Sequence, residues 1–358
     1  MNTTLAGSGK ARRPSLERSI IHGAQLLGVG GFFLALLVFF SFRAEHFDES
    51  SNVLNILSNS SVVGVVALGQ AFVLISGGFD LSVSGTVPLG GIIFTVGCND
   101  GYGVFWSTVL AIAAGIGVGL ANGLIITQIK INPLITTLAT LSIIGGLAYV
   151  VSDGVTITLN NLSDAPLGNN LGGVQVCIWL LLALSVVMFV ILRYTVFGRM
   201  LYAMGGNREA ARLAGLRVNV VTTGVYMISG GLSCFAGVML ANQLLAGAPT
   251  VESTANLQSI TAVIVGGASL TGGTGGIPGT LLGILVLGTV SNGMALMQVP
   301  TFYQEIATGG ILLLAVGLGW ARGLVEQAVW KRAREDHVLS SGVADEGSAG
   351  VLNLTGGE

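Results

Sequence analysis

The stretch from residue 60 to residue 97, SSVVGVVALGQAFVLISGGFDLSVSGTVPLGGIIFTVG, decides the fold of this protein. Its only charged residue is Asp80. A membrane-spanning helix needs about 20 apolar residues, so the stretch is too long for one crossing and leaves no room for an ordinary loop between two. We therefore predict two membrane helices joined by a sharp turn at Gly77, Gly78, Phe79 and Asp80. Glycine adopts such turns without steric cost, and the side chain of Asp80 or Ser82 can cap the second helix.

The composition of the whole chain points to the same class of protein. Its 358 residues are 52% hydrophobic and 9% charged, and 55 of them are glycine. Soluble proteins contain about 25% charged residues and about 7% glycine. This excludes a soluble enzyme and a disordered chain, and it predicts a polytopic, all-α membrane protein. The three cysteines and three histidines are isolated, so they indicate neither a disulfide framework nor a metal site.

Uncharged runs predict about ten transmembrane helices, with the N- and C-termini both cytoplasmic. Besides the two helices around the turn, the predicted spans are residues 23–42, 104–127, 133–151, 175–192, 221–241, 258–276, 280–298 and 305–320. The glycine-rich residues 266–278 are the predicted break between the eighth and ninth spans.

The positions of the charges determine the predicted orientation. Of the 15 basic residues, only Arg43 then falls on the outer side, as the positive-inside rule requires. The predicted organisation is a cytoplasmic N-terminal tail (1–20), a transmembrane domain (21–320) with a cytoplasmic loop (193–220), and a cytoplasmic C-terminal tail (321–358). The end of that tail is small, polar and acidic, and is predicted to be disordered.

Glycines recur at four-residue spacing in two places. Gly115, Gly119 and Gly123 form one series, and Gly275, Gly279 and Gly283 form the other. Small residues at this spacing let helix backbones approach closely, so both series predict helix packing. The alternative is a moving helix pair that gates a path.

A weak internal repeat connects the two glycine-rich breaks. Gly77, Gly78 and, further on, Asn122 reappear in the same order as Gly266, Gly267 and Asn292, although the spacings differ. Duplicated helical units are common in transporters. Ten spans make the two copies parallel, a miscounted span would make them inverted, and chance matching in a glycine-rich chain is the third interpretation.

The cytoplasmic loop contains GGNREAARLAG at residues 205–215. Asn207 is a good N-cap, the following residues favour helix, and Gly215 suits a helix end. We predict a helix of two turns on the cytoplasmic surface. Taken alone, such a helix could simply rest on lipid headgroups.

Four stretches together resemble the ribose-type (monosaccharide) permeases of bacterial ATP-binding-cassette importers. They are residues 75–83 (ISGGFDLSV), 119–123 (GLANG), the loop 197–215, and 266–273 (GGASLTGG) with Asn292 and Gly293. The chain departs from the family pattern at Phe79, usually Ile, and at Gln258, often acidic, which bears on the substrate but not on the family.

The resemblance implies a multi-pass subunit of the bacterial inner (plasma) membrane that works as a pair. Two identical copies are expected, and a gene for a second, different permease would make the pair a heterodimer. A periplasmic binding protein would deliver the sugar, and cytoplasmic ATP-binding subunits would hydrolyse ATP-Mg, so no cofactor, enzymatic activity or nucleic-acid partner is expected of this chain. Gly7 to Lys10 resembles the end of a Walker motif, but Ala11 stands where Ser or Thr is needed. The residues implied in contact with the ATPase, through a coupling helix, are Gly205, Gly206, Asn207, Glu209, Ala210, Ala211, Leu213 and Gly215.

Uncharged polar side chains and glycines are the candidates for a translocation path or hinge. They are Gln70, Gly77, Gly78, Asp80, Asn122, Gly266, Gly267 and Asn292. Amides exchange hydrogen bonds with sugar hydroxyls, and no basic side chain falls within the spans, so a neutral substrate is expected. Hydrogen bonding between helices is the alternative role of these amides.

Two other functional classes compete with the importer. An ion-coupled secondary transporter of a small neutral solute usually needs ionisable residues at membrane depth, where this chain offers only Asp80. A membrane enzyme is less favoured, because the spans contain no histidine cluster, Ser-His-Asp set or metal-ligand set.

Overall fold

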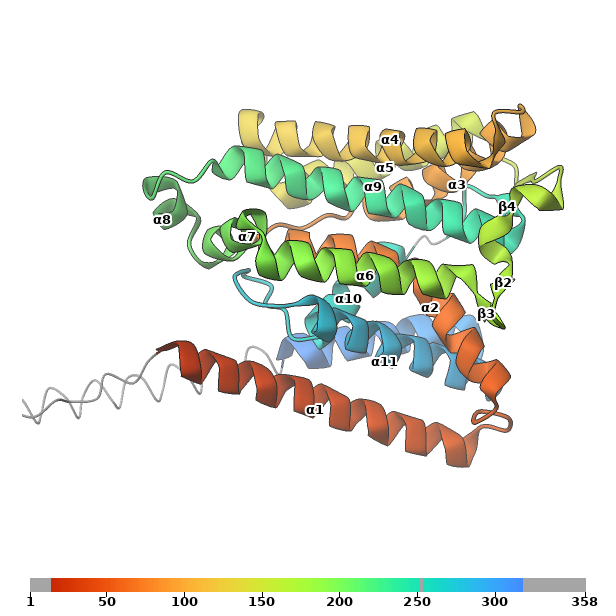
Figure 1. Ribbon diagram of the computed structural model, residues 1–358, viewed down its shortest axis with the longest axis horizontal. Helices are drawn as coiled ribbons and strands as arrows, with labels where there is room; N and C mark the ends of the chain where they lie inside the picture. Colours follow the sequence, from red (N-terminus) through yellow and green to blue (C-terminus); the bar gives the residue numbers. More distant parts are fainter. Residues whose placement is uncertain (1–13, 252–253, 318–358) are drawn as a thin grey trace, which may run out of the picture. The chain divides into compact units, whose positions relative to one another are not determined.

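The computed structural model describes residues 14–251 and 254–317, and most of these residues are helical (Figure 1). The predicted tail 321–358 and most of the tail 1–20 lie outside the described residues. The long helices are α1 (Pro14–Arg43), α2 (Ser50–Ile75), α3 (Val83–Asn99), α4 (Gly103–Leu124), α5 (Pro133–Val151), α6 (Val176–Tyr194), α9 (Val218–Leu244) and α11 (Ile277–Leu296). The shorter helices are α7 (Val196–Gly206), α8 (Arg208–Leu213) and α10 (Ala255–Val265), and residues 301–317 are also helical. One compact unit ends at Ile311, and a second begins at Leu312.

Among the described residues, six helices are long and apolar enough to cross a membrane: α2, α4 with its π-helical extension (Ile125–Ile129), α5, α6, α9 and α11. Shorter apolar helices cover Leu27–Arg43, Val83–Asn99 and Ala255–Val265. The protein is therefore an all-α polytopic membrane protein, as predicted. Helix α2 is its core element, since 83% of its most apolar window is buried, against 22% for α5. The exposed apolar faces of α4, α5 and α6 suit contact with lipid.

The turn predicted in the deciding stretch is confirmed. Helix α2 ends at Ile75, α3 begins at Val83, and Gly77 between them has a φ of +78°. The predicted cap is wrong in detail, because the Ser82 side chain caps no helical N–H. The Asp80 carboxylate instead accepts the N–H of Ser82 itself, at 3.0 Å. This local bond holds the turn rather than the helix end.

The predicted span 258–276 is wrong in extent. Helix α10, of 11 residues, already ends at Val265, and residues 266–276 form a loop before α11. The glycines at 267, 272, 273 and 275 all have positive φ, a conformation that other residues rarely adopt and that ends the helix. The loop 193–220 also differs from expectation, since it contains α7 as well as the predicted short helix.

The first glycine series packs helices together as predicted. A Cβ on Gly115 would lie 2.2 Å from the carbonyl oxygen of Gly230, and one on Gly119 would lie 2.1 Å from that of Tyr226. Helices α4 and α9 therefore touch backbone to backbone. The second series is only partly helical: Gly283 packs against the Ala262 carbonyl, but Gly275 lies in the loop with a φ of +134°.

Short strands gather at the end of the long helices opposite α7 and α8 (Figure 1). Strand β1 (Ile157–Thr158) pairs antiparallel with β4 (Ala246–Gly247), and β2 (Asn170–Leu171) pairs with β3 (Val174–Gln175). The segment between α5 and α6 is thereby held against the C-terminal end of α9.

Candidate functional site

Helix α8 forms as its sequence predicts. The Asn207 side chain accepts the N–H of Ala210 at 2.9 Å, and Gly215 follows the helix with a φ of +82°. Both ends therefore use the predicted residues. On its surface, a hydrogen bond from Arg212 at 2.7 Å holds the pKa of the exposed Glu209 below its usual value.

The predicted ATPase-contact residues divide into two groups. Gly206, Asn207, Glu209, Ala210, Leu213 and Gly215 are exposed, and the Leu213 side chain is 78% exposed. Ala211 is buried within the chain, and Gly205 is partly buried. An exposed leucine beside a charged pair is a surface that a protein partner can cover.

Gly205 belongs to a contact between three segments, which we call the glycine junction and define by Gly77, Gly205, Gly272 and Gly273. A Cβ on Gly205 would lie 1.9 Å from the carbonyl oxygen of Ile75 and 2.5 Å from the amide nitrogen of Gly273. The Gly273 N–H donates to that same Ile75 carbonyl at 2.9 Å. The end of α7 therefore contacts both the turn after α2 and the loop before α11. A shift of α7 would either carry these two segments with it or break its contacts with them.

Three residues predicted separately come together in one buried polar cluster, which we call the Asp80 network. The Asp80 carboxylate accepts hydrogen bonds from Ser82 Oγ at 2.5 Å and from Ser229 Oγ at 2.7 Å. Gln70 Nε2 donates to the Asp80 carbonyl at 2.9 Å. Asn122 Nδ2 donates to Ser82 Oγ at 3.0 Å, and Asn122 Oδ1 accepts from Thr140 Oγ1 at 2.6 Å. The network thus joins α2, the turn, α4, α5 and α9.

The Asp80 network is closed to solvent in this conformation. Gln70 and Asn122 are 0% exposed and Asp80 is 1% exposed. In the described part of the chain, every donor to the Asp80 carboxylate is uncharged. Gln70 Oε1 is buried without a partner there. These side chains therefore line no open passage here, and any role in a path requires the helices to move.

The other path candidates lie elsewhere. Gly78 packs beneath the Tyr226 hydroxyl, which donates to the carbonyl of Phe79 at 3.0 Å. Gly266 packs on Gly279 of α11, and Gly267 makes the turn that follows α10 with a φ of +95°. Asn292 is remote from the Asp80 network, because its amide donates to Asn52 near the start of α2 at 2.9 Å.

Sequence reasoning missed the face of α9 that carries Thr222, Tyr226 and Ser229. Their spacing of four and three residues places them on one side of the helix. Thr222 accepts from Arg208 Nη2 at 3.2 Å, and Arg208 is the first residue of α8. Tyr226 and Ser229 bind the Phe79 carbonyl and the Asp80 carboxylate. One helix face therefore connects α8 to the Asp80 network. Hydroxyls alone are too common in a sequence to signal this.

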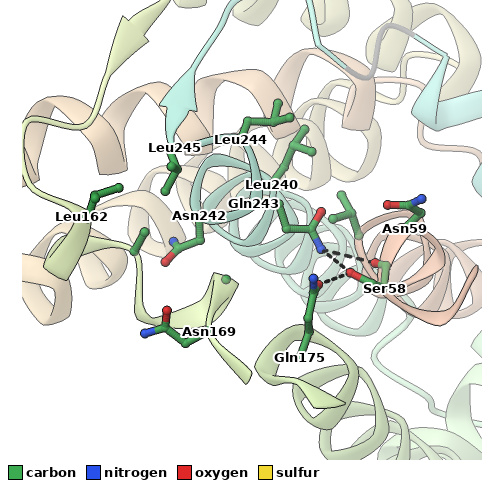
Figure 2. A pocket seen from close by; sticks show the side chains of 13 residues that line it. Ser58, Asn59, Leu162, Asn169, Gln175, Leu240, Asn242, Gln243, Leu244 and Leu245 are labelled. Atoms are coloured by element: carbon green, nitrogen blue, oxygen red, sulfur yellow. Dashed lines mark hydrogen bonds between the residues drawn. The ribbon is translucent and has the colours of Figure 1, made fainter. Parts of the chain in front are cut away.

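Sequence reasoning also missed a cavity of about 690 Å³ at the end of the protein opposite α8 (Figure 2). Its polar wall residues are Ser58, Asn59, Asn169, Gln175, Asn242 and Gln243, and apolar residues such as Leu162, Leu240 and Leu245 complete it. None of the lining residues is charged. The paired amides at 242–243 were the only signal available, and nothing in the sequence joined them to residues 58–59 or 169–175.

The arrangement defines a class: a membrane permease subunit, with lipid-facing helices, sealed polar groups at depth and a surface helix at one end. A family model described as "Branched-chain amino acid transport system / permease component" matches residues 52–316, and the chain belongs to that family.

Three sugar permeases are similar to this protein over most of its length. It is 38% identical to the L-arabinose ABC transporter permease protein AraH of Azospirillum brasilense, over 82% of this chain and 87% of the relative. It is 35% identical to the ribose import permease protein RbsC of Bacillus subtilis (strain 168), over 86% and 97% respectively. It is 41% identical to the L-arabinose transport system permease protein AraH of Escherichia coli (strain K12), over 72% and 78%. No solved structure matches the chain.

These matches confirm the resemblance to ribose-type permeases. The chain is a multi-pass protein of the bacterial inner membrane, and its family has a transport role rather than a catalytic one.

Proposed function

We propose that this chain is the membrane subunit of an ATP-driven importer that carries a neutral monosaccharide of the ribose and arabinose class. The observation that carries the proposal is the 35–41% identity, over most of the chain, to permeases named for these two pentoses. The family description names branched-chain amino acids, whose ammonium and carboxylate groups would need charged partners. Asp80 is the one charged side chain buried at depth in the described residues, which favours an uncharged substrate.

The proposed topology has ten spans, with residues 1–20, the loop 193–220 and residues 321–358 in the cytoplasm and residues 21–320 as the permease domain. The helical residues 301–317 and the nine apolar helices before them support this count. The functional unit has two permease copies, because a cassette ATPase works as a pair and each chain offers one α8. A periplasmic sugar-binding protein supplies the substrate.

Helix α8 is the proposed contact with the cytoplasmic ATP-binding subunit. Its exposed Asn207, Glu209 and Leu213 form the docking face, and Arg208 connects it to α9. Closure of the ATPase pair would push α8 and, through the glycine junction and the Thr222–Tyr226–Ser229 face, act on the turn that carries Asp80. The turn glycines and Gly266 and Gly267 then serve as hinges, and the Asp80 network opens and closes during alternating access.

Uptake by right-side-out vesicles reconstituted with the complete importer tests the proposal. We expect inward transport of L-arabinose or D-ribose that requires trapped ATP and continues when a protonophore collapses the proton gradient. Uptake abolished by the protonophore, with ATP still present, would reject the ATP-driven importer and favour the ion-coupled carrier. Asp80→Asn should retain substantial transport, because an amide oxygen can still accept the Ser82 N–H and the amide nitrogen can donate to Ser229.

Variants of α8 test the docking face separately. Glu209→Trp combined with Leu213→Asp should prevent ATPase binding while the permease still inserts in the membrane. Arg217→Trp, an exposed position beyond the helix, is the matched control. Normal co-purification of the ATPase with the double variant would count against this contact. Separately, the mass of the solubilised wild-type complex tests the proposed stoichiometry, and a mass corresponding to one permease per complex would count against two permease copies.

A further inference from the structure

The uncharged cavity described above lies far from the proposed ATPase contact. Its wall comes from the N-terminal part of α2, the segment between α5 and α6, and the C-terminal end of α9. Gln243 is 25 residues along α9 from Val218, which in an α-helix is about 38 Å. In the proposed topology the cavity therefore opens on the periplasmic side, where a sugar arrives.

Hydrogen bonds hold the wall in a defined shape. Ser58 Oγ bonds to Gln175 Oε1, and Gln243 Nε2 donates to the Ser58 carbonyl at 3.3 Å, which ties α2, β3 and α9 together (Figure 2). Asn242 Oδ1 accepts the N–H of Leu167 at 3.1 Å and its Nδ2 donates to Val238. The cavity is thus pre-formed by side-chain contacts between distant segments rather than left by loose packing.

Two side-chain amides in the wall of the cavity are available to bind a ligand. The side chains of Asn59 and Asn169 are exposed, and neither makes a side-chain hydrogen bond within the part of the chain that the structure describes. In Figure 2 they lie apart, with Gln175 and Gln243 between them. An asparagine side chain offers two donors and an acceptor, so each can bind neighbouring hydroxyls of one ligand.

The lining selects a neutral, hydroxyl-rich ligand. Amides exchange hydrogen bonds with hydroxyls at little desolvation cost, whereas a phosphate or carboxylate would lose hydration without meeting a cation. Leu162, Leu240 and Leu245 provide apolar surface for the C–H face of such a molecule. A volume of about 690 Å³ is in the range of about 300–1,000 Å³ found for small-molecule sites.

We propose that this cavity is an outer binding site, present in each permease copy, for the monosaccharide before it crosses the membrane, with Asn59 and Asn169 as its principal contacts. This inference rests on the proposed sugar import. It assigns the first contact with the sugar to residues other than Gln70, Asn122 and Asn292. The side-chain amide of each of these three residues already donates a hydrogen bond within the protein.

Binding of L-arabinose and D-ribose to the purified permease–ATPase complex in nanodiscs, without the binding protein, tests the site. The variants are Asn59→Ala with Asn169→Ala, which removes both free amides, and Asn169→Trp, which fills the cavity from an exposed position. Asn160→Ala is the matched control, because Asn160 is an exposed amide of the same outer segment that does not line the cavity. Ribose 5-phosphate is the charged comparison, and basal ATPase activity reports an intact complex.

We expect the double variant to bind sugar about tenfold more weakly and to raise the KM of uptake similarly, since two hydrogen bonds are lost. Asn169→Trp should abolish binding, the control should equal the wild type, and ribose 5-phosphate should not bind. If the wild type imports sugar while both cavity variants bind and transport it with wild-type constants, the site is refuted and the proposed function stands. If the wild type shows no ATP-dependent sugar uptake, the proposed function fails and the site assignment fails with it.

Discussion

The bond between Ser229 and Asp80 joins α9 to the turn after α2 and allows a quantitative test. Ser229→Ala removes the Oγ that donates to Asp80 Oδ2 at 2.7 Å, at a position that is 0% exposed. Hydrogen bonds to a charged group contribute about 1.5–3 kcal/mol, and those between neutral groups about 0.5–1.5 kcal/mol. With Asp80 as an ionised carboxylate, Ser229→Ala should lower the free energy of unfolding by about 1.5–3 kcal/mol.

Ser233→Ala is the matched control. Ser233 lies one turn further along α9, is also 0% exposed, and donates only to the carbonyl of Ser229 at 2.8 Å. Ser233→Ala should therefore lower the free energy of unfolding by no more than about 0.5–1.5 kcal/mol, as for a hydrogen bond between neutral groups. Combining Ser229→Ala with Asp80→Ala completes a double-mutant cycle, for which residues in one network give coupling energies of about 0.5–3 kcal/mol.

The free energy of unfolding would be measured by titrating mixed micelles with a denaturing detergent, and the ATP hydrolysed per sugar imported would be measured in proteoliposomes. We expect Ser229→Ala to lower stability more than Ser233→Ala and to raise the ATP consumed per sugar, because α9 then keeps only the Tyr226 hydrogen bond to the turn. Equal costs for the two serines, together with a coupling energy near zero, would refute a stabilising bond to Asp80. A change in stability without a change in ATP use would limit the bond to a structural role.

Three further pairs of variants test the packing and the caps. Gly119→Val should cost about 1–3 kcal/mol in the same unfolding assay, because it forces α4 away from α9, whereas Gly117→Val on the same helix meets nothing within 4 Å and should be tolerated. Gly205→Ala should reduce transport by disrupting the glycine junction, while its neighbour Gly206→Ala, with open space around it, should retain transport in the vesicle assay. Asn207→Ala should destabilise α8 by about 1 kcal/mol and weaken ATPase binding, and Asn207→Asp should preserve both, since a carboxylate caps equally well.

Features that depend on neighbouring residues were predictable from the sequence. The turn after α2 needs a glycine at positive φ, and the α8 cap needs one asparagine three residues before the N–H that it accepts. The close helix packing at Gly115 and Gly119 followed from their spacing and from the close approach that small residues allow, whereas α9 as the partner helix did not. The glycine-rich residues 266–278 marked the break after α10, but the predicted span ran on to residue 276 because that stretch carries no charge, whereas its glycines have already left the helical conformation.

Only the tertiary structure decided which polar residues meet. Ser229 reaches Asp80 across 149 positions and Gln243 reaches Ser58 across 185, whereas Asn292 turns to Asn52 rather than to the amides it was grouped with. A buried polar group is stabilised by whichever partner the packing of helices brings within hydrogen-bond distance, and that choice depends on the rotation and crossing of each helix. The sequence alone determined a polytopic membrane protein with a capped surface helix, because composition, charge placement and local caps act over short distances. The Asp80 network and the outer cavity required the fold, because each is assembled from segments that have no local sign of one another.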